Sequence, residues 1–177
     1  LAFSIINSPS FKDEYSLIYC TIGSGGLDKL CEVINILPYD IEKLKEFAIE
    51  KKIDFTVVGP EVPLSLGIVD TFEKVGLKIF GPNKDAALLE TSKIFAKKIM
   101  QEMNIPTAKY SKFNRESIKD ARDYIKDVKY PVVIKADGLA AGKGVIICSN
   151  ETEAMETLNQ FSGARIFGNS SDNFIIE

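Results

Sequence analysis

The chain has 177 residues, of which 45% are apolar and 27% are charged, and its net charge is −3. This length gives one domain or two small ones, and the apolar content is ample for a packed core. The negative net charge argues against a nucleic-acid partner, because binding to a phosphate backbone calls for clustered excess lysine and arginine. No apolar run approaches the ~20 residues that a membrane-spanning helix needs.

Histidine is absent, and Cys20, Cys31 and Cys148 form no C-x-x-C pair. The lack of histidine excludes Ser-His and Cys-His nucleophiles as well as His-based zinc sites from this chain. Cys20 and Cys148 lie in apolar, strand-like runs, where we expect buried thiols and a reducing, cytoplasmic environment. Any catalysis must therefore use lysine, carboxylate, backbone groups or an added metal.

Both ends of the sequence have the pattern of an interrupted chain. Leu1–Ile6 reads as a helix entered partway, and it has neither an initiator Met nor the basic region of a signal peptide. Asn173–Glu177 stops on a strand pattern. We therefore expect the chain to be a fragment of a longer protein.

The first half of the chain alternates strand and helix patterns. Strand-like apolar runs occur at residues 16–22, 33–37, 53–58 and 77–80. Helical spacing of apolar residues follows the N-cap residue Asp40 and recurs over residues 66–75. Short links between strand, helix and strand predict a right-handed βαβ unit and a parallel sheet. Gly59-Pro60 and Gly81-Pro82 each end a strand, so both turns should lie at the carboxyl edge, where such sheets bind ligands.

The loop Gly59–Leu64 carries Glu61 between two prolines. A stiff loop that holds a carboxylate suits the hydroxyl groups of a sugar or an amine. The same residues also suit a helix start, with Glu61 and Pro63 near the N-terminus for dipole and φ reasons. The residues alone leave both interpretations open.

Helical patterns follow Pro82. Asn83 caps a run through Leu89, and a second helix places Ile94, Phe95, Ile99 and Met103 inward before it ends at Asn104-Ile105-Pro106. Lys93, Lys97 and Lys98 line the other side of this second helix, which by itself predicts a solvated face. The remaining patterns are an extended segment at 106–113, a helix opened by Asn114 or Ser117, a helix capped by Thr152, a polar loop at 163–173 and a strand at 174–176.

Two β-branched runs, at 132–134 and 145–147, flank a loop that is rich in small residues; we call residues 130–148 the Gly hairpin. Its glycines permit positive φ and leave backbone N–H groups accessible, and Lys135 and Lys143 bring two cations, a combination that suits phosphate. A solvated surface hairpin is the plainer alternative. The spacing fits neither a Walker loop nor a G-x-G-x-x-G fingerprint, and a strand follows the loop rather than a helix. The remaining phosphate-binding interpretation is a hairpin that lies over a triphosphate.

These patterns predict an α/β fold in three parts. Residues 1–82 form a parallel, Rossmann-like βαβ domain, and residues 83–105 form a helical linker. Residues 106–177 form an α+β subdomain with antiparallel strands that contains the Gly hairpin.

The chain resembles the phosphoribosylamine–glycine ligases, also called glycinamide ribonucleotide synthetases, which are ATP-grasp enzymes of purine synthesis. The resemblance rests on D-F-T-V-V-G-P-E-V-P-L, L-K-I-F-G-P, T-S-K, N-I-P-T-A and V-V-I-K-A-D-G-L-A-A-G-K-G-V, and it spans nearly the whole chain. It implies a pre-ATP-grasp domain followed by the first ATP-grasp subdomain, truncated at the hinge that borders the adenine. It also implies that the opening strand precedes Leu1 and that well over half of the enzyme follows Glu177.

The resemblance also implies site residues. Those implied to bind ATP are Lys93, Lys135, Asp137, Gly138, Gly142, Lys143, Gly144, Val145 and Glu177. Gly138–Val145 would form a mobile lid with Lys143 at its tip, and Glu177 would be the first hinge residue. Gly59, Pro60 and Glu61 resemble the loop that helps bind 5-phosphoribosylamine. No catalytic residue or metal ligand is implied within this chain.

The implied reaction couples ATP cleavage to amide formation. Glycine's carboxylate takes the γ-phosphoryl group to give glycyl phosphate, and the amine of phosphoribosylamine then displaces phosphate. ATP and Mg²⁺ (or Mn²⁺) are the implied cofactors, in a cytoplasmic monomer with small-molecule substrates, and the fragment alone should be inactive. Alternatives are another ATP-grasp ligase acting on a different acid, such as a related purine carboxylase, and a non-catalytic nucleotide-binding module. A Rossmann oxidoreductase would need a fingerprint that the chain lacks.

Overall fold

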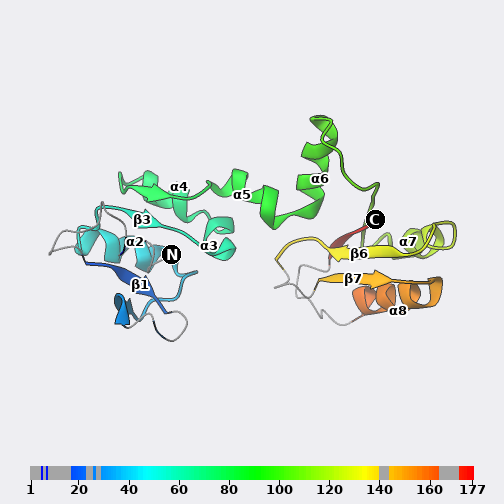
Figure 1. Cartoon of the computed structure of the whole chain (residues 1–177), viewed down its shortest axis with the longest axis horizontal. Helices are drawn as coiled ribbons and strands as arrows, with labels where there is room; N and C mark the ends of the chain where they lie inside the picture. The colour runs from blue at the N-terminus through cyan, green and yellow to red at the C-terminus, as the bar shows by residue number, and fades with distance from the viewer. Residues whose placement is uncertain are drawn as a thin grey trace. The chain divides into compact units, whose positions relative to one another are not determined.

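The fold is that of a computed structural model, which describes Ile5, Asn7, Gly26 and residues 17–22, 29–139, 144–163 and 172–177. The chain divides into two compact units, residues 1–87 and 88–177 (Figure 1). The boundaries 82 and 105 that the sequence suggests stay a prediction. In the described ranges, no helix is long and apolar enough to cross a membrane.

The first unit contains two parallel strand pairs. Strand β1 (Tyr19–Thr21) pairs with β2 (Glu32–Ile34), and β3 (Thr56–Val57) pairs with β4 (Ile79–Phe80). Helices α3 (Glu61–Ser65) and α4 (Ile68–Glu73) connect β3 to β4. The predicted parallel βαβ unit is therefore confirmed, although its strands are shorter than their apolar runs. The expected helix at Leu1–Ile6 lies largely outside the described residues.

Helix α2 (Ile41–Glu50) begins as predicted at Asp40, whose side chain accepts a hydrogen bond from the Lys43 backbone N–H. The helix predicted over residues 66–75 is present as α4, which covers Ile68–Glu73. Gly67 has a φ of +83°, which separates α3 from α4 because L side chains rarely adopt that conformation. The core of the unit is made of buried apolar side chains, namely Ala48, Leu64, Ile68, Val69, Phe72 and Ala87.

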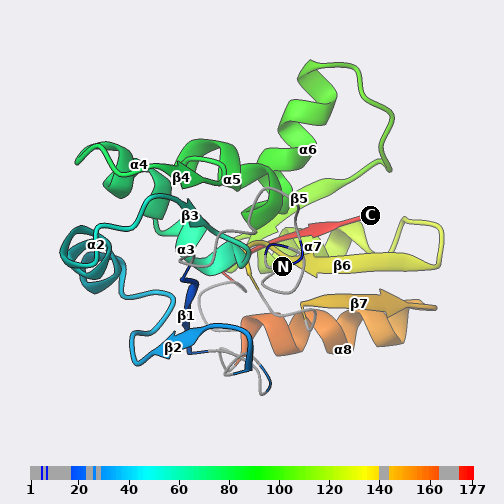
Figure 2. The ribbon, with the colours of Figure 1, turned by 60° about the vertical axis from the view of Figure 1, so that its left-hand side comes forward.

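Helix α5 (Lys84–Thr91) spans the boundary between the units and begins at Asn83, whose side chain accepts from the Ala86 backbone N–H. The second unit then follows with α6 (Lys93–Glu102), β5 (Ser111–Asn114), α7 (Ile118–Tyr124), β6 (Val132–Ala136), β7 (Val145–Cys148), α8 (Glu151–Ser162) and β8 (Asn173–Ile176). Its strands form one antiparallel sheet in the order β5-β8-β6-β7 (Figure 2). The predicted antiparallel hairpin is thus present as β6 and β7.

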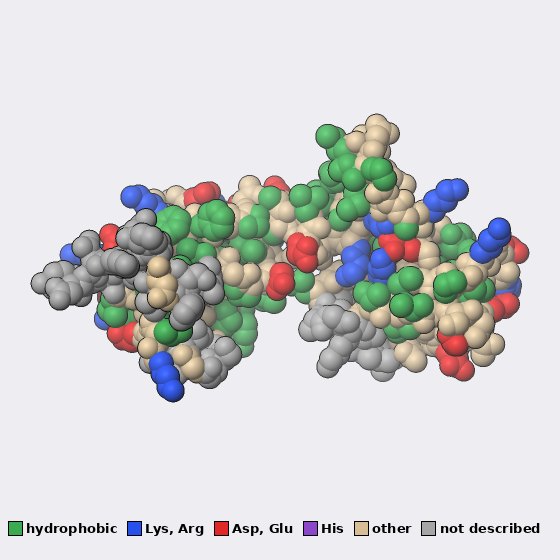
Figure 3. All heavy atoms as spheres, in the orientation of Figure 1, with side chains coloured by type: hydrophobic (Ala, Val, Ile, Leu, Met, Phe, Trp, Pro, Cys, Tyr) green, Lys and Arg blue, Asp and Glu red, His purple; other side chains and the backbone are tan. Residues whose placement is uncertain are grey.

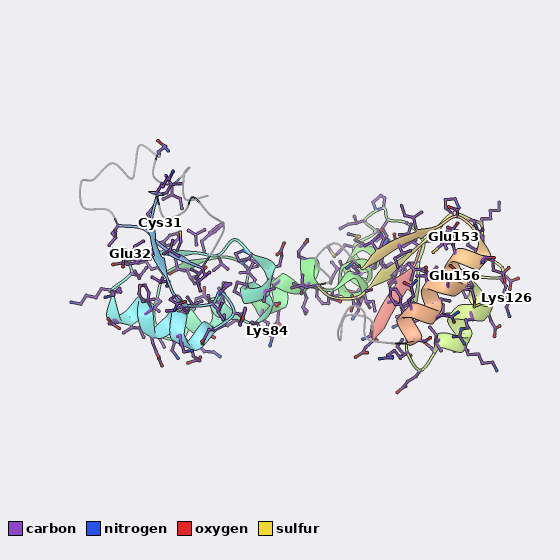
Figure 4. The ribbon with its side chains drawn as sticks, turned by 90° about the horizontal axis from the view of Figure 1, so that it is seen from below. Cys31, Glu32, Lys84, Lys126, Glu153 and Glu156 are labelled. Atoms are coloured by element: carbon purple, nitrogen blue, oxygen red, sulfur yellow. The ribbon has the colours of Figure 1, made fainter. Side chains whose placement is uncertain are left out.

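Helices α7 and α8 contact each other and cover one face of this sheet (Figure 4). In Figure 4, Lys126 follows α7, and Glu153 and Glu156 mark α8. Alternate strand residues point to this face, as the two-residue period of a strand requires. The core here consists of Ala121, Ile125, Val132, Ile134, Ala136, Cys148, Ala154, Leu158, Phe161, Phe174 and Ile176.

Two details of the helices correct the sequence analysis. Helix α8 is capped by Asn150 rather than Thr152, because the Asn150 side chain accepts from the Glu153 backbone N–H at 3.0 Å. Glu153 in turn accepts from the Ser149 backbone N–H at 2.8 Å, which completes a reciprocal cap. Met103 was expected to face inward but is 67% exposed, because α6 ends one residue before it.

The cysteines are free thiols, and Cys148 is buried as predicted. Cys20 and Cys31 are only partly buried, and they meet where β1 runs beside the start of β2. Burial and a hydrogen bond with Cys31 raise the pKa of the Cys20 thiol to about 11. Cys31 and Glu32 are labelled at β2 in Figure 4.

Candidate functional site

The second unit leaves one face of its sheet without α7 and α8, and this face carries charged side chains. The register pairs Lys135 with Ile175 and with Val145, so these three residues share a face. Glu177 continues β8 by exchanging both backbone hydrogen bonds with Val133, at 2.8 and 2.9 Å. Because residues two apart on a strand point the same way, Glu177 lies on the same face as Lys135.

Glu177 is the negative centre of this face. Its carboxylate accepts a hydrogen bond from Lys135 through Oε2 and forms an ion pair with Lys97 Nζ, 2.5 Å from Oε1. The Glu177 side chain is only 9% exposed, compared with 11% for Lys97 and 26% for Lys135. We call Lys97, Lys135 and Glu177 the charge cluster.

The charge cluster lies where the ribbon of Figure 1 ends at the C-terminus, and Figure 3 shows basic and acidic side chains gathered at this place. Burial alone would raise the pKa of the Glu177 carboxyl. The hydrogen bond and charge of Lys135, together with those of Lys97, outweigh burial and hold this pKa below its usual value. Glu177 is therefore ionised at neutral pH.

The loop of the Gly hairpin begins just after Lys135 of the charge cluster. The Ala136 N–H donates to the Gly144 carbonyl at 2.7 Å, which closes the two strands just before the loop. Gly138 has a φ of +97°, so the chain leaves β6 through a conformation that glycine adopts without strain. Val145 is 45% exposed at the start of β7. Gly142 and Lys143, which the sequence assigns to the lid and its tip, lie outside the described residues.

Asp137 joins the root of the hairpin to the start of α6. Its carboxylate accepts from the Ile94 backbone N–H and from the Ser92 hydroxyl, each at 3.1 Å. Lys93 donates from Nζ to the Gly138 carbonyl at 3.2 Å. Because free N–H groups crowd the first turn of a helix, Asp137 satisfies one of them and fixes the helix against the hairpin. Lys93, Asp137 and Gly138, all expected at an ATP site, therefore lie together.

Lys97 corrects the sequence analysis, because a solvated face was predicted for it. The whole residue is 9% exposed, whereas the neighbouring Lys98 side chain is 67% exposed and pairs with Glu102 along the helix. Lys97 follows the apolar Ile94 by three positions, which places both on one helix face. This spacing is the sequence signal that Lys97 lies on the buried face of the helix.

The second predicted site lies in the first unit. Glu61 is the first residue of α3, after Pro60 with φ −80° and ψ 151°, so the helix-start interpretation is confirmed. Gly59, Pro60 and Glu61 are exposed. The nearby Gly81 is closely packed, because an added Cβ would come within 2.8 Å of a Leu64 methyl carbon. Binding of phosphoribosylamine by this loop stays a prediction.

The described residues contain no group of three or more Asp, Glu, Cys or His side chains placed to hold a metal ion.

Comparison with known proteins gives the family of both units. The N domain of phosphoribosylglycinamide synthetase matches residues 1–90, and the ATP-grasp (A) domain of the same enzyme matches residues 91–177. A phosphoribosylamine–glycine ligase from Caldanaerobacter subterraneus subsp. tengcongensis is 51% identical over 174 residues, which are 98% of this chain and 41% of that protein. The chain thus spans about two fifths of the length of such relatives.

Solved structures agree with this assignment. The phosphoribosylamine–glycine ligase of Thermotoga maritima has 28% identity and a TM-score of 0.60, over 91% of this chain and 37% of its own. The biotin carboxylase domain of Hydrogenobacter thermophilus 2-oxoglutarate carboxylase, solved with MgADP, ADP and bicarbonate, has a TM-score of 0.68 over 84% of this chain and 35% of its own. Its 23% identity supports the fold alone. On these matches, the chain belongs to the phosphoribosylglycinamide synthetase family of ATP-grasp ligases.

Proposed function

We propose that this chain forms part of an enzyme that ligates glycine to 5-phosphoribosylamine and cleaves ATP to ADP and phosphate. Membership of the family supports the reaction, and the charge cluster beside the Gly hairpin supports the place where ATP binds. The activity is proposed for the full-length protein, since this chain spans 41% of a close relative. Its monomeric state and cytoplasmic location stay predictions.

One observation supports the ATP site: Lys135 lies on the face of the sheet opposite α7 and α8, two residues before the glycine turn at Asp137-Gly138. Its only polar partner in the described ranges is Glu177, and its side chain is 26% exposed. An ammonium group has three N–H donors, so two remain for a ligand. Lys93 likewise uses one donor, for the Gly138 carbonyl. Two such cations beside a glycine-rich turn fit the phosphates of a nucleotide.

These residues define what the chain would contribute to phosphoryl transfer. Lys93 and Lys135 would hold phosphate oxygens and offset the negative charge that spreads over them, while the Gly hairpin would add backbone donors and exclude water. Asp137 would keep Lys93 and the hairpin in one geometry through its bonds to the start of α6. Glu61 would meet the amine or hydroxyl groups of phosphoribosylamine.

Mg²⁺ or Mn²⁺ would accompany ATP in the proposed reaction and would help to offset the negative charge of its phosphates. The described residues do not form a metal site. No step proposed for these residues depends on the metal.

The proposal is tested by Lys135→Ala in the full-length protein, with Lys119→Ala as the matched control. Lys119 is an exposed lysine on α7, in the helical layer behind the sheet. We expect glycine-dependent ADP release to fall at least about a hundredfold in Lys135→Ala, since one electrostatic contact to the reacting group contributes this much. Lys119→Ala should keep the wild-type rate. Unchanged turnover in Lys135→Ala would refute the phosphate-binding role.

A further inference from the structure

Lys97 is a buried lysine that the proposed reaction does not use. It lies in the middle of α6 and is 9% exposed. A lysine is rarely buried without partners, because removing an ammonium group from water is unfavourable unless other polar groups replace the water. The side chain of the neighbouring Lys98, by contrast, is 67% exposed.

The partners of Lys97 come from three separate segments. Its Nζ donates to the Thr107 hydroxyl at 2.6 Å and to the Ala108 carbonyl at 3.1 Å, and it lies 2.5 Å from Glu177 Oε1. The same nitrogen lies 5.5 Å from the ring centroid of Tyr110, within the range of a cation–π contact. Thr107 and Ala108 are the last two residues of the N-I-P-T-A motif, which has no role in the proposed reaction.

The two lysines of the charge cluster are therefore unequal. Lys97 is fully engaged by protein groups, whereas Lys135 has one partner and is more than twice as exposed, at 26% against 11% for the side chains. Lys97 thus has no donor to offer a ligand, whereas Lys135 has two. Two ammonium groups share one carboxylate, so the cluster keeps one net positive charge.

Removing Lys97 would change how strongly Glu177 neutralises the charge of Lys135. Glu177 would then face Lys135 alone, and their charges would cancel in a poorly hydrated place where charge interactions are strong. The carboxylate would also lose the group that holds it from the α6 side. A phosphate group would have to compete with Glu177 for the ammonium of Lys135.

We propose that Lys97 is a positioning residue for nucleotide binding. By holding Glu177 from the α6 side it keeps the carboxylate from neutralising Lys135, so that Lys135 stays available to phosphate. This inference rests on the proposed function and deepens it. Lys97 acts through Glu177 and Lys135 and does not touch the nucleotide.

The test is a double-mutant cycle in the full-length protein. Lys97→Met keeps an unbranched apolar stem and removes the charge, and it should raise the Kd and KM for ATP roughly tenfold while kcat changes less than about twofold. In a Lys135→Ala background, the same Lys97→Met change should leave the Kd for ATP within about twofold, because its target is gone. Lys97→Arg, which keeps a cation opposite Glu177, should restore most of the affinity. Lys98→Met is the matched control and should match the wild type.

Two results would overturn the inference. One is a lower thermal stability of Lys97→Met with an unchanged Kd for ATP, which would make Lys97 a purely structural residue. The other is an equal loss of affinity with and without Lys135, which would mean that Lys97 acts independently of it. If Lys97→Met does not fold, Thr107→Val decides: it removes one acceptor that orients Nζ and should raise the Kd for ATP about threefold only when Lys135 is present. Failure of the proposed function itself would look different, because the wild-type protein would not bind ATP.

Discussion

The carboxylate of Asp137, one residue past β6, lies 3.1 Å from the backbone nitrogen of Ile94 in the first turn of α6. The two residues are 43 positions apart, and their hydrogen bond fixes the root of the Gly hairpin against the helix that carries Lys93 and Lys97. The cap therefore links the sheet and the helix that together form the charge cluster.

Loss of this cap should destabilise the protein. We predict that Asp137→Ala lowers the free energy of unfolding by about 1–2 kcal/mol, because a partly buried hydrogen bond to the first turn of a helix has roughly this value. Urea denaturation of the full-length protein measures it. Asp127→Ala removes an exposed aspartate and should change stability by less than about 0.5 kcal/mol. Equal stability of both variants would show that the Ile94 contact contributes nothing.

Much of the second unit follows from local sequence. The β-branched runs around the Gly hairpin became β6 and β7, since alternate side chains could pack under α7 and α8. The cap of α8 was misplaced because Asn150 and Thr152 are both good cap residues, and only the position of Glu153 distinguishes them.

The charge cluster was harder to foresee, because its partners are remote in sequence. Lys97 finds Glu177 80 positions away, and helical periodicity says nothing about acceptors on another strand. Lys135 and Glu177 were proposed separately through the family resemblance, and only the β6–β8 register puts them on one face. In the first unit, α4 begins later than the helical pattern at residue 66, because Gly67 takes a positive φ and a single glycine in a helical pattern is compatible with either outcome.

Glu177 should make stability depend on pH. Its pKa is lower in the folded than in the unfolded protein, so its contribution is complete above the unfolded value and is lost as pH falls through the folded value. We predict that wild type is more stable than Glu177→Gln at pH 7, and that this difference shrinks below about pH 4.5, near the unfolded pKa of a glutamate. Denaturant titrations at a series of pH values measure the difference. A constant difference from pH 7 to pH 3 would contradict the ion-pair account.

Gly138 should resist substitution by residues with a side chain. At a φ of +97°, alanine is strained, and we predict that Gly138→Ala costs about 1–2 kcal/mol of stability and weakens ATP binding. Gly138→Asn should cost less, because asparagine tolerates positive φ better than alanine. Calorimetric unfolding and ATP titration of the two variants give the comparison. A larger loss for asparagine than for alanine would contradict the backbone explanation.

Cys20 should react slowly with alkylating agents. Burial and the Cys31 hydrogen bond raise its pKa from 9.0 to about 11, so the folded protein holds roughly a hundredfold less thiolate at pH 8 than the unfolded chain. Mass spectrometry of iodoacetamide labelling, with and without urea, measures the two rates. Cys31→Ala removes the hydrogen-bond partner and should speed the labelling of Cys20 in the folded protein. Equal rates for Cys20 in folded and unfolded wild type would contradict the raised pKa.

The charge cluster is proposed to bind ATP in a glycine–phosphoribosylamine ligase. The most direct measurement is ADP formation by the full-length protein with ATP and Mg²⁺, omitting each substrate in turn. We predict one ADP for each amide formed, only when glycine and 5-phosphoribosylamine are both present, and little with bicarbonate or another acid in place of glycine. Sustained ADP formation with bicarbonate, or none with glycine and 5-phosphoribosylamine together, would contradict the account.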